Sequence, residues 1–507
     1  MRIEVRPVAK LRGPDPVNVP AALGSVFDAL TSAAVDLTEL RIVCDWIQYR
    51  HNLAETVQCR SVLAERPARD GQPGDGLNPA GSPEPAHVPE RAMEIAIDLR
   101  RGGDAELAVS LKEALAEHGD PASPARTVLE PWLPGRDSCI WRFNALYWEA
   151  LSRWEQAAGR EYEQALPGGK SEGRNTDMAR ELILELMRVW DELDARRALP
   201  EELYVVELGV GNGNQARAWL DTFLTVDRAH GRDYYRRLHY LMGDYSPHAL
   251  QRARQAVAHH GSHVSALVMD ATRPQVTLGF LRGKAFLVYI SNVYDNLPTD
   301  EIAIIGGRPY LVEVRAYVRR ADALQIARRH HCPVRDLAAL TGRLLRLGPE
   351  LLAEAAPAQF ADVGRAVAFW QETWAALRLQ QRYVPLDGLD AYQVAPAITG
   401  EILRPLLESG GDIRMHVSNG ALASFTGTLP LLHPFGRLIC HDLFVAGPGQ
   451  YHTGFHGPGK YDGSVVNWVN GPLLQLAGSR RGFDVQITPL AGRPAASVKT
   501  LTAQVRD

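Results

Sequence analysis

The stretch YVVELGVGNG, residues 204–213, decides the fold that this sequence predicts. An apolar run interrupted only by Glu207 is typical of a buried parallel strand. Glycines then alternate at Gly209, Gly211 and Gly213, ahead of a stretch with helical periodicity. Glycine lets the chain turn with positive φ and lets a ligand touch the backbone. The segment therefore predicts a strand, a tight turn and a helix that together form a ligand-binding loop.

The glycine spacing separates two kinds of ligand site. A dinucleotide site, which holds pyrophosphate at the helix N-terminus, prefers G-x-G-x-x-G. The spacing here is G-x-G-x-G, preceded by Glu207. This spacing disfavours a nicotinamide dehydrogenase, which tight NADH binding would support. A glycine-rich turn without any ligand is the remaining alternative.

Short apolar runs continue on both sides of helical stretches along the rest of the chain. Further strands are expected at residues 239–243, 265–269, 286–290, 412–417, 436–444, 483–488 and 497–503. Strands that alternate with helices indicate a parallel sheet with crossover connections. The last two strands are expected to form an antiparallel pair. The predicted fold class is α/β, with a Rossmann-like seven-stranded sheet.

Acidic residues stand where the second and third of these strands end. Asp244 and Tyr245 follow the second strand, and a carboxylate there can accept both hydroxyl hydrogens of a ribose. Asp270 and Ala271 follow the third strand, where an acidic side chain can accept from an adenine amino group. The fourth strand runs into Ser291. Acidic residues also end many strands as solvated caps, so the prediction depends on their common register.

The overall composition argues against several function classes. The 507 residues carry 55 basic and 59 acidic side chains, a formal net charge of −4, without a basic stripe. Phosphate-binding proteins usually show a basic excess, so no nucleic-acid partner is expected. No run of eighteen apolar residues exists, so no membrane span is expected. The five cysteines are widely spaced without a C-x-x-C pair, which is typical of reduced thiols in a cytoplasmic protein.

Three histidines in the last quarter of the chain invite interpretation as a metal site. They are His441, His452 and His456, and His-x-x-x-His on a helix would point both rings the same way. The surrounding glycines and prolines argue against a helix, so no metal is predicted. The histidine pairs at 259–260 and 330–331 are expected on solvated helix positions.

The chain divides into three predicted parts. Residues 1–125 form an accessory N-terminal α+β region that contains a Pro/Gly-rich linker at 66–90. Residues 126–315 and 393–507 form the ligand-binding domain. Between them, residues 316–392 repeat apolar side chains at helical spacing, which predicts a helical insertion that acts as a lid.

The motifs taken together resemble the MidA-type S-adenosylmethionine (SAM)-dependent methyltransferases, which include the mitochondrial complex I assembly-factor methyltransferases. The family's E-L-G-x-G-x-G is matched at residues 207–213. Its Y-x-x-x-E-x-S-P is matched at 240–247, with Asp244 in place of glutamate. Its N-E-x-x-D-x-L-P is matched at 292–298, with Val293 in place of glutamate.

Two later family motifs are matched more loosely, at residues 438–443 and 459–468. The resemblance spans about residues 160–495 and does not reach 1–125. It implies a class I methyltransferase sheet with SAM as cofactor, as part of a SAM-dependent methyltransferase. The implied cofactor-binding residues are Glu207, Gly209, Gly211, Asn212, Gly213, Asp244, Tyr245, Asp270, Ala271 and Ser291.

The candidate catalytic residue is Asp295, at the mouth of the fourth strand, with Asn292 as its hydrogen-bonding partner. A carboxylate there can orient a nitrogen acceptor or take its proton; the alternative for Asp295 is a loop cap. Glu313 and Asp442 are secondary candidates. Family members methylate protein arginine, but a guanidinium is normally held by carboxylates, and Val293 departs from that pattern.

The predicted function is methyl transfer to nitrogen or oxygen of a protein side chain, arginine included, or of a small molecule. The alternative is a non-catalytic assembly or scaffold protein that kept the fold. Formation of S-adenosylhomocysteine would separate the two. The sequence does not indicate an oligomeric state.

Overall fold

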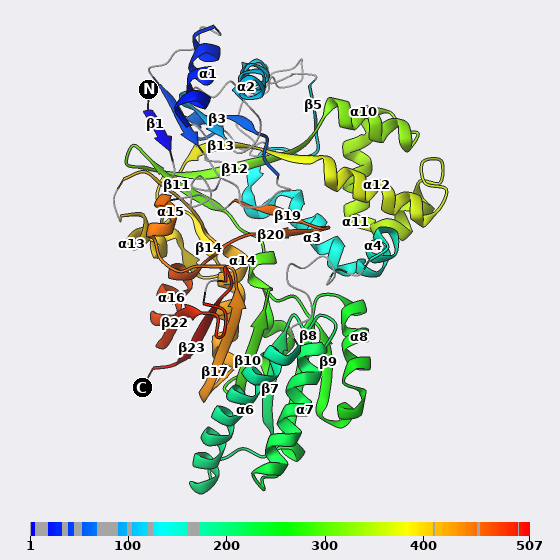
Figure 1. Ribbon diagram of the computed structural model, residues 1–507, viewed down its shortest axis with the longest axis vertical. Coiled ribbons are helices and arrows are strands. Elements are labelled where there is room, and N and C mark those ends of the chain that lie inside the picture. Colours follow the sequence, from blue (N-terminus) through cyan, green and yellow to red (C-terminus); the bar gives the residue numbers. More distant parts are fainter. Residues whose placement is uncertain are drawn as a thin grey trace, which may run out of the picture.

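Two β-sheets organise the chain, one in each half of the molecule (Figure 1). The computed structural model describes residues 2–5, 19–32, 39–44, 53–67, 90–98, 104–119, 125–160, 162, 172–408, 411–453, 457–494 and 496–506. Most of the predicted linker 66–90 lies outside the described residues, as do His456 and the side chain of His452. Among the described residues, no helix is long and apolar enough to span a bilayer. All five cysteines are free thiols.

The first sheet has seven strands and confirms the predicted Rossmann-like fold class. Its β7, β8, β9, β10 and β17 are mutually parallel, and β23 runs antiparallel to β17 and β22. In spatial order the strands are β22 (Phe483–Pro489), β23 (Lys499–Val505), β17 (Leu432–Asp442), β10 (Ala285–Ser291), β7 (Leu203–Leu208), β8 (Leu238–Asp244) and β9 (Val264–Val268). The glycine loop therefore follows a central strand, at the carboxyl edge of the parallel strands.

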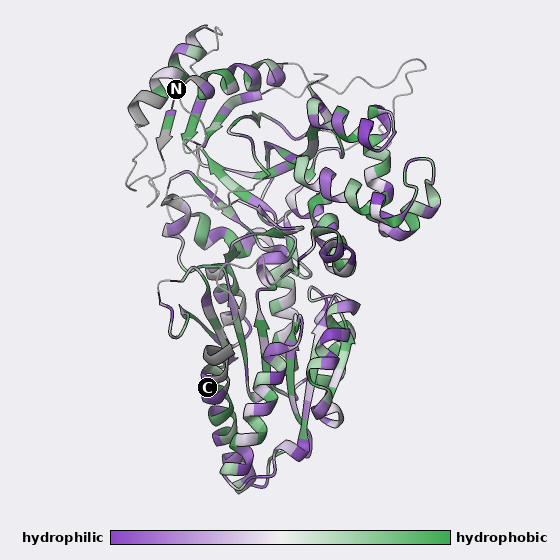
Figure 2. Ribbon diagram, turned by 45° about the vertical axis from the view of Figure 1, so that its right-hand side comes forward, coloured by the Kyte–Doolittle hydropathy of each residue, from purple (hydrophilic) through white to green (hydrophobic). Residues whose placement is uncertain are grey.

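Helices cover both faces of this sheet. Leu203 and Val205 of β7 point into a core formed with α6 (Glu172–Ala195) and α7 (Asn214–Ala229). The alternate residues of β7 point into a second core with α14 (Asn419–Thr428) and α16 (Gly471–Ser479). Side chains on successive strand positions face opposite ways, so burial on both faces explains the nearly continuous apolar run. Figure 2 shows hydrophobic strands beneath helices with hydrophilic outer faces.

The predicted strand-free insertion at 316–392 is wrong at both of its ends. Strand β12 runs over Arg308–Arg319, and β13 runs over Leu377–Pro385. Strand β11 (Glu301–Ile305) precedes β12 in a hairpin that pairs Ile305 with Arg308. Gly306 and Gly307 form its turn, both with positive φ, as a two-residue hairpin requires. Leu377 fitted the helical spacing, but it is extended and ends the preceding helix.

These strands belong to a second, ten-stranded sheet that also contains the N-terminal strands. Its main order is β1 (Arg2–Val5), β2 (Leu40–Cys44), β4 (Glu90–Ile97), β3 (Val57–Leu63), β13, β12, β11 and β16 (Ile413–His416), and β12 also pairs β5 (Arg126–Val128) and β6 (Leu133–Pro134). The predicted boundaries at residues 125, 315 and 393 therefore run through one sheet. Backbone hydrogen bonds between distant segments, which no local pattern encodes, join them.

The helical part of the insertion is confined to α10 (Arg320–Arg329), α11 (Leu337–Ala355) and α12 (Val363–Ala376). They share a core with α3 (Cys139–Glu149) and α4 (Leu151–Ala158). This helical group lies beside the ten-stranded sheet, above α8 (Figure 1). Whether it acts as a lid stays a prediction.

Candidate functional site

The glycine loop is a tight bend held by its own backbone. Gly209, Gly211 and Gly213 have φ of +76°, +56° and +79°. A Cβ on Gly211 would lie 2.8 Å from the Tyr162 hydroxyl, and one on Gly213 would lie 2.6 Å from Ala253 Cα. A Cβ on Gly209 would collide with Val293 Cγ2. Each glycine is thus required by backbone conformation and by close approach together.

Most backbone donors of this loop already have acceptors. The N–H groups of Gly209 and Val210 donate to the Gly243 carbonyl, at 2.7 and 3.2 Å, and that of Gly213 donates to Val210 O. Asn212 Oδ1 accepts from Asn214 N–H at 3.0 Å, at the start of α7. The predicted ligand residue Asn212 therefore uses its side-chain oxygen to cap the helix.

Asp244, at the end of β8, is tied to the loop. Its Oδ2 accepts from Gly211 N–H at 2.9 Å and its Oδ1 from Ser246 N–H at 2.8 Å. Burial raises its pKa, although these backbone hydrogen bonds act in the opposite direction. Ser246 in turn caps α8 (Pro247–Ala256), with Pro247 at the first helical position. Each carboxylate oxygen keeps a further lone pair for a ligand hydroxyl.

Glu207 lies in the interior of the sheet. It is 3% exposed, and its Oε2 accepts from the Tyr240 hydroxyl at 2.7 Å. Burial raises its pKa to about 8, so the carboxyl is protonated at neutral pH. The sequence placed Glu207 among the cofactor ligands; the structure places it beneath the loop, beside Tyr240.

The ends of β8 and β9 present an apolar surface next to an acid. Two apolar side chains are exposed to solvent there, Val268 at 59% and Tyr245 at 40%. Asp270 is also exposed, and its Oδ1 accepts from the N–H and the hydroxyl of Thr272, at 2.8 and 2.7 Å. Exposed apolar side chains beside an acceptor suit a flat heterocycle with an amino group.

The turn after β10 is organised by Asp442 of β17. Its Oδ2 accepts from the N–H groups of Val293, Tyr294 and Asp295, at 3.1, 2.8 and 3.4 Å. Asn292 opens the turn with a φ of +52° and donates its N–H to His441 O. Ser291, the last residue of β10, is only partly buried, and Asn292 is exposed. The strand ends of β10 and β17 thus hold a fixed turn that faces the glycine loop through Val293.

Asp295 and Asp442 form a buried acid pair. Asp295 is 5% exposed, Asp442 is fully buried, and Asn296 donates to Asp295 Oδ1 at 2.7 Å. Burial and the neighbouring Asp442 raise the pKa of Asp295 well above its ordinary value, and burial raises that of Asp442 to about 6. Two carboxyls in one buried site share a proton. The raised pKa and the shared proton accordingly tie the Asp295 side chain to Asp442.

Asn467 is a polar residue at this site that the sequence did not single out. Its backbone N–H donates to the Asp295 carbonyl at 2.9 Å. The side chain is 2% exposed, and its Nδ2 has no hydrogen-bond acceptor among the described residues. A buried amide without an acceptor is destabilising, so it marks a position where a ligand can accept. The motif at 459–468 contained this signal.

Helices α3 and α4 lie across the ends of β7 and β8. The Tyr245 hydroxyl donates to Glu149 Oε1 at 2.9 Å, and Arg252 of α8 is 3.5 Å from Glu155. The Tyr162 ring packs edge-on against Trp148 of α3 at 5.6 Å, and its hydroxyl lies over Gly211. The aromatic pair Tyr162 and Trp148 therefore lies next to the glycine loop.

Glu313, a predicted secondary catalytic residue, lies on β12 in the ten-stranded sheet. Arg382 donates to its Oε2 twice, at 2.9 and 2.7 Å. Arg382 also stacks on Trp132, at 4.6 Å from the ring centroid. The structure gives Glu313 the contacts of a sheet ion pair and does not bring it together with Asp295 and Asn292, which follow β10.

The histidine expectations need correction at two positions. His260 and His330 are each 1% exposed, so they are not solvated helix residues. His330 packs against Phe369 and faces Glu372, whereas His260 belongs to a polar cluster described below. His441 bonds Thr500 at 2.9 Å, and burial lowers its pKa to about 4.

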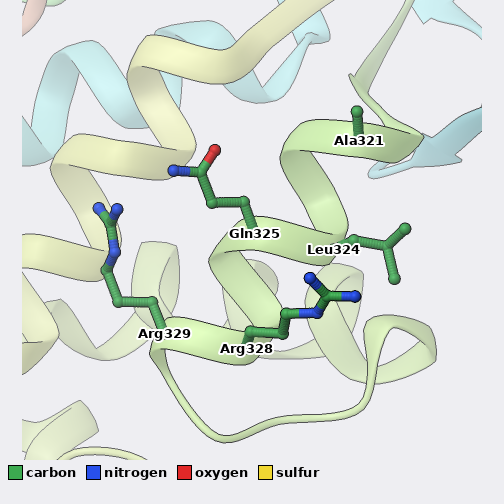
Figure 3. Close-up of a pocket in the computed structure, with 5 residues that line it drawn as sticks. All are labelled: Ala321, Leu324, Gln325, Arg328 and Arg329. Carbon is green, nitrogen blue, oxygen red and sulfur yellow. The ribbon is translucent and has the colours of Figure 1, made fainter.

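A hollow of about 460 Å³ elsewhere on the surface is lined only by residues of α10. Figure 3 shows that its side chains spread from the helix in different directions. They are Ala321, Leu324, Gln325, Arg328 and Arg329. Because polar groups do not converge there, this surface lacks the character of a ligand site.

Comparisons with known proteins give a limited result. No protein-family model and no curated protein matches the chain. The chain is similar to two solved COG1565 superfamily proteins from Burkholderia thailandensis, each at 14% identity. The alignment with an uncharacterised protein has a TM-score of 0.42 and covers 79% of this chain and 91% of that one. The alignment with a likely methyl transferase bound to S-adenosyl-homocysteine has a TM-score of 0.43 and covers 79% and 92%.

The chain is also similar to the CcbJ methyltransferase from Streptomyces caelestis. The identity is 11%, the TM-score is 0.29, and 65% of this chain and 90% of that chain are covered. Similarities at these scores carry no argument about ligand or activity. The functional proposal below depends on the geometry of the strand ends.

Proposed function

We propose that the chain binds SAM at the glycine loop and the ends of β7, β8 and β9, and transfers its methyl group to a nitrogen or oxygen acceptor. One observation carries this proposal: the acids at the strand ends are buried without basic partners. Asp244, Asp295 and Asp442 all have raised pKa values, and the causes that lower them are hydrogen bonds from backbone N–H groups and the Asn296 amide rather than arginine or lysine. Such an edge favours a ligand that brings a positive charge, as a sulfonium does.

The loop also argues against a phosphate-bearing dinucleotide. Pyrophosphate binding at a helix N-terminus needs free N–H groups. Here the N–H groups of Gly209, Val210, Gly211 and Gly213 all donate within the protein. A neutral contact surface remains, which suits a methionine moiety without phosphate. The donor pattern therefore supports SAM over NAD.

The ends of β8 and β9 fit the adenosine part of the cofactor. Asp244 retains lone pairs for ribose hydroxyls, and Asp270 can accept from an adenine amino group. The exposed faces of Val268 and Tyr245 offer apolar contact for the ring. These assignments follow the predicted roles of Asp244, Tyr245 and Asp270.

Bound SAM would supply an activated methyl group, so the protein's part is to align the acceptor and exclude water. Asp442 fixes the turn that carries Asn292 and Asp295 by accepting three backbone hydrogen bonds. The amide of Asn467 acts as a hydrogen-bond donor to the acceptor molecule, while Asp295 shares its proton with Asp442. We therefore assign Asp295 a positioning role in place of the predicted role of base.

The acceptor class follows from Val293. The Val293 side chain packs on Gly209. The resembled family carries a glutamate at the position of Val293. Without that carboxylate, the site lacks the bidentate partner that a guanidinium normally uses. The acceptor that fits best is a neutral nitrogen or oxygen of a small molecule or of a protein side chain. The chain itself is proposed to be related to the MidA-type methyltransferases.

The test is isothermal titration calorimetry with SAM on wild type, Gly211→Ala and Gly231→Ala. Both glycines have positive φ, but a Cβ on Gly231 meets nothing within 4 Å. The two substitutions therefore introduce similar backbone strain, of about 1 kcal/mol. Gly211→Ala should weaken SAM binding at least about 10-fold, a loss of about 1.4 kcal/mol, while Gly231→Ala binds as wild type does. Absence of SAM binding by wild type would refute the proposal, and tight NADH binding would replace it with a dehydrogenase.

A second candidate function is a SAM-binding protein without catalysis. Val293 favours it, because this side chain cannot act as a base at the position where the resembled family carries a glutamate. An acceptor screen that monitors S-adenosylhomocysteine decides between the two. Product formation that depends on Gly211 establishes the enzyme, whereas binding without product across the screen supports the scaffold.

A further inference from the structure

A cluster of two histidines and one aspartate lies on the opposite edge of the seven-stranded sheet. Asp221 belongs to α7, and His259 and His260 belong to the 3-10 helix η4 (Ala258–His263) that leads into the amino end of β9. Because the glycine loop lies at the carboxyl ends of these strands, the cluster is separate from the candidate SAM site. Figure 1 shows α7 and α8 side by side in this half of the molecule.

The ligand atoms of the three residues converge. Both imidazole Nε2 atoms approach the same carboxylate oxygen, His259 at 2.9 Å and His260 at 3.0 Å from Asp221 Oδ1. All three potential ligand atoms lie within 4.8 Å of one another. Around a tetrahedral zinc with bonds of about 2.0–2.1 Å, ligand atoms lie about 3.3 Å apart. Entry of the ion therefore requires Asp221 Oδ1 to separate from each Nε2 by only a few tenths of an ångström.

His260 is held as a metal-binding histidine usually is. Its side chain is 1% exposed, and its other ring nitrogen, Nδ1, lies 2.5 Å from the Tyr235 hydroxyl. A hydrogen bond at the second ring nitrogen fixes the ring and its tautomer. His259 and Asp221 are about half exposed, so water can reach the open coordination positions.

We propose that Asp221, His259 and His260 form a binding site for a divalent transition metal, with zinc as the ion that two imidazoles and a carboxylate suit. Without metal, both Nε2 atoms carry the hydrogen and donate to Asp221, while Tyr235 donates to His260 Nδ1. With metal, His260 carries its hydrogen on Nδ1 and donates it to the Tyr235 oxygen. The bound ion links α7 to η4 and stabilises this edge of the sheet.

The test is equilibrium dialysis of the tag-free full-length chain against Zn²⁺, with metal analysis and thermal unfolding. Wild type should retain about one Zn²⁺ per chain and unfold at higher temperature when loaded. His259→Ala should lose at least about 10-fold in affinity, and Tyr235→Phe should lose a similar or smaller factor, since outer-shell partners of metal ligands carry about 10- to 100-fold. His259 is exposed, so its substitution leaves the core intact.

His239→Ala is the matched control. His239 is also a partly exposed histidine beside a carboxylate, 3.8 Å from Glu202, and no third ligand in the described part of the chain joins them. It should bind zinc as wild type does. Failure of wild type to retain zinc would overturn the proposal, as would equal zinc retention by His259→Ala, which would place the ion elsewhere. Neither result depends on SAM binding.

Discussion

In the ten-stranded sheet, the buried acid Glu94 is surrounded by arginines, whereas Glu207 in the seven-stranded sheet accepts a hydrogen bond from the Tyr240 hydroxyl and meets no basic side chain among the residues that the structure describes. Arg60 donates to Glu94 Oε1 at 3.0 Å, and Arg41 lies 3.4 Å from Oε2. Burial alone would raise the pKa of Glu94, but Arg60, Arg41 and Arg414 outweigh it and lower the pKa to about 2. For Glu207, burial prevails and raises the pKa to about 8.

The difference shows where each sheet uses its acids. A compensated buried charge fixes structure, because removal of one partner leaves the others unpaired. Uncompensated acids destabilise the fold and collect where a ligand supplies the missing charge. The strand ends of the seven-stranded sheet also carry the acid pair Asp295 and Asp442, so the contrast extends beyond one residue.

The largest effect is expected when the compensated charge is removed. Glu94→Gln removes the buried carboxylate that faces Arg60 and Arg41, although Arg41 keeps its ion pair with Asp412, and should lower the free energy of unfolding by about 3–5 kcal/mol at pH 7. The depressed pKa means that Glu94 stabilises the fold above the unfolded-state pKa of about 4.3, and that this contribution is lost as the pH falls towards 2. Urea unfolding at several pH values measures both.

Glu90→Gln is the control for this substitution. Glu90 lies on the same strand, but it is exposed and bonds Ser61 and His118. Its loss should change the free energy of unfolding by less than about 1 kcal/mol. Equal effects of the two variants would mean that the arginines around Glu94 do not compensate it.

The second effect has the opposite sign and a different pH window. Because the folded-state pKa of Glu207 is raised, its favourable contribution is complete below the unfolded pKa of about 4.3 and is lost as the pH rises through 8. Glu207→Gln should therefore unfold as wild type does at pH 4 and be more stable by roughly 2 kcal/mol at pH 6, at about 1.4 kcal/mol per unit of pKa. Unfolding curves at both pH values test this.

Glu202→Gln provides the comparison for Glu207→Gln. Glu202 is an exposed residue just before β7 and accepts from the Tyr204 hydroxyl. Its substitution should leave the pH dependence of unfolding close to that of wild type. An unchanged slope in Glu207→Gln would show that Glu207 reaches solvent in the folded protein.

The sequence predicted the seven-stranded sheet well because its signals are local. The apolar runs at β7, β8 and β10 and the glycines after β7 encode strand and turn within a few residues of one another. The carboxyl ends of parallel strands must meet at one edge, so the order of the motifs also predicted that Asp244, Asp270 and Asp295 lie at that edge.

The ten-stranded sheet could not be predicted in the same way. It pairs β3 with β13 across more than three hundred residues, at Val62 and Tyr383. Only the Gly306-Gly307 turn gave a local signal for a hairpin. Leu377 followed the helical spacing of α12 and concealed the start of β13, since one residue fits both periodicities at such a boundary.

The site residues also divide into features that the local sequence predicts and features that depend on contacts between distant segments. The sequence named Asp295 and Asp442 as separate catalytic candidates, but their shared burial, which raises both pKa values, is a property of the packed structure. The wrong expectation for His260 has the same cause. Its partners Asp221 and Tyr235 come from other elements, so its local sequence suggested an exposed position.

A smaller effect is expected when the acid pair is split. In Asp295→Asn, the side-chain amide keeps a hydrogen-bond donor near Asp442 but cannot ionise. Since the raised pKa values make the wild type lose stability as the pH rises above the unfolded-state pKa of about 3.9, the variant should match it at pH 3 and gain roughly 1–2 kcal/mol at pH 5. Methyl transfer, once an acceptor is known, should fall only modestly, because the donor is retained.

The acid pair offers its own control. Asp442→Asn also removes one carboxyl, but Asp442 accepts three backbone N–H groups of the turn after β10. This variant should lose stability at every pH, because an amide replaces one oxygen acceptor. Similar behaviour of the two variants would contradict the assignment of separate roles within the pair.

The smallest effect tests whether burial, and not the presence of an ion pair, distinguishes the two sheets. Arg153 of α4 lies 2.7 Å from Glu350 of α11, a distance as short as those in the ten-stranded sheet, yet both side chains are nearly half exposed. Water screens such a pair and solvates each charge almost as favourably as the opposite charge does. Arg153→Ala should therefore change the free energy of unfolding by less than about 1 kcal/mol. The residual effect should shrink further in high salt. A loss as large as that of Glu94→Gln, measured by the same urea titration, would mean that ion pairing stabilises this protein regardless of exposure, and the contrast between compensated and uncompensated buried acids would lose its physical basis.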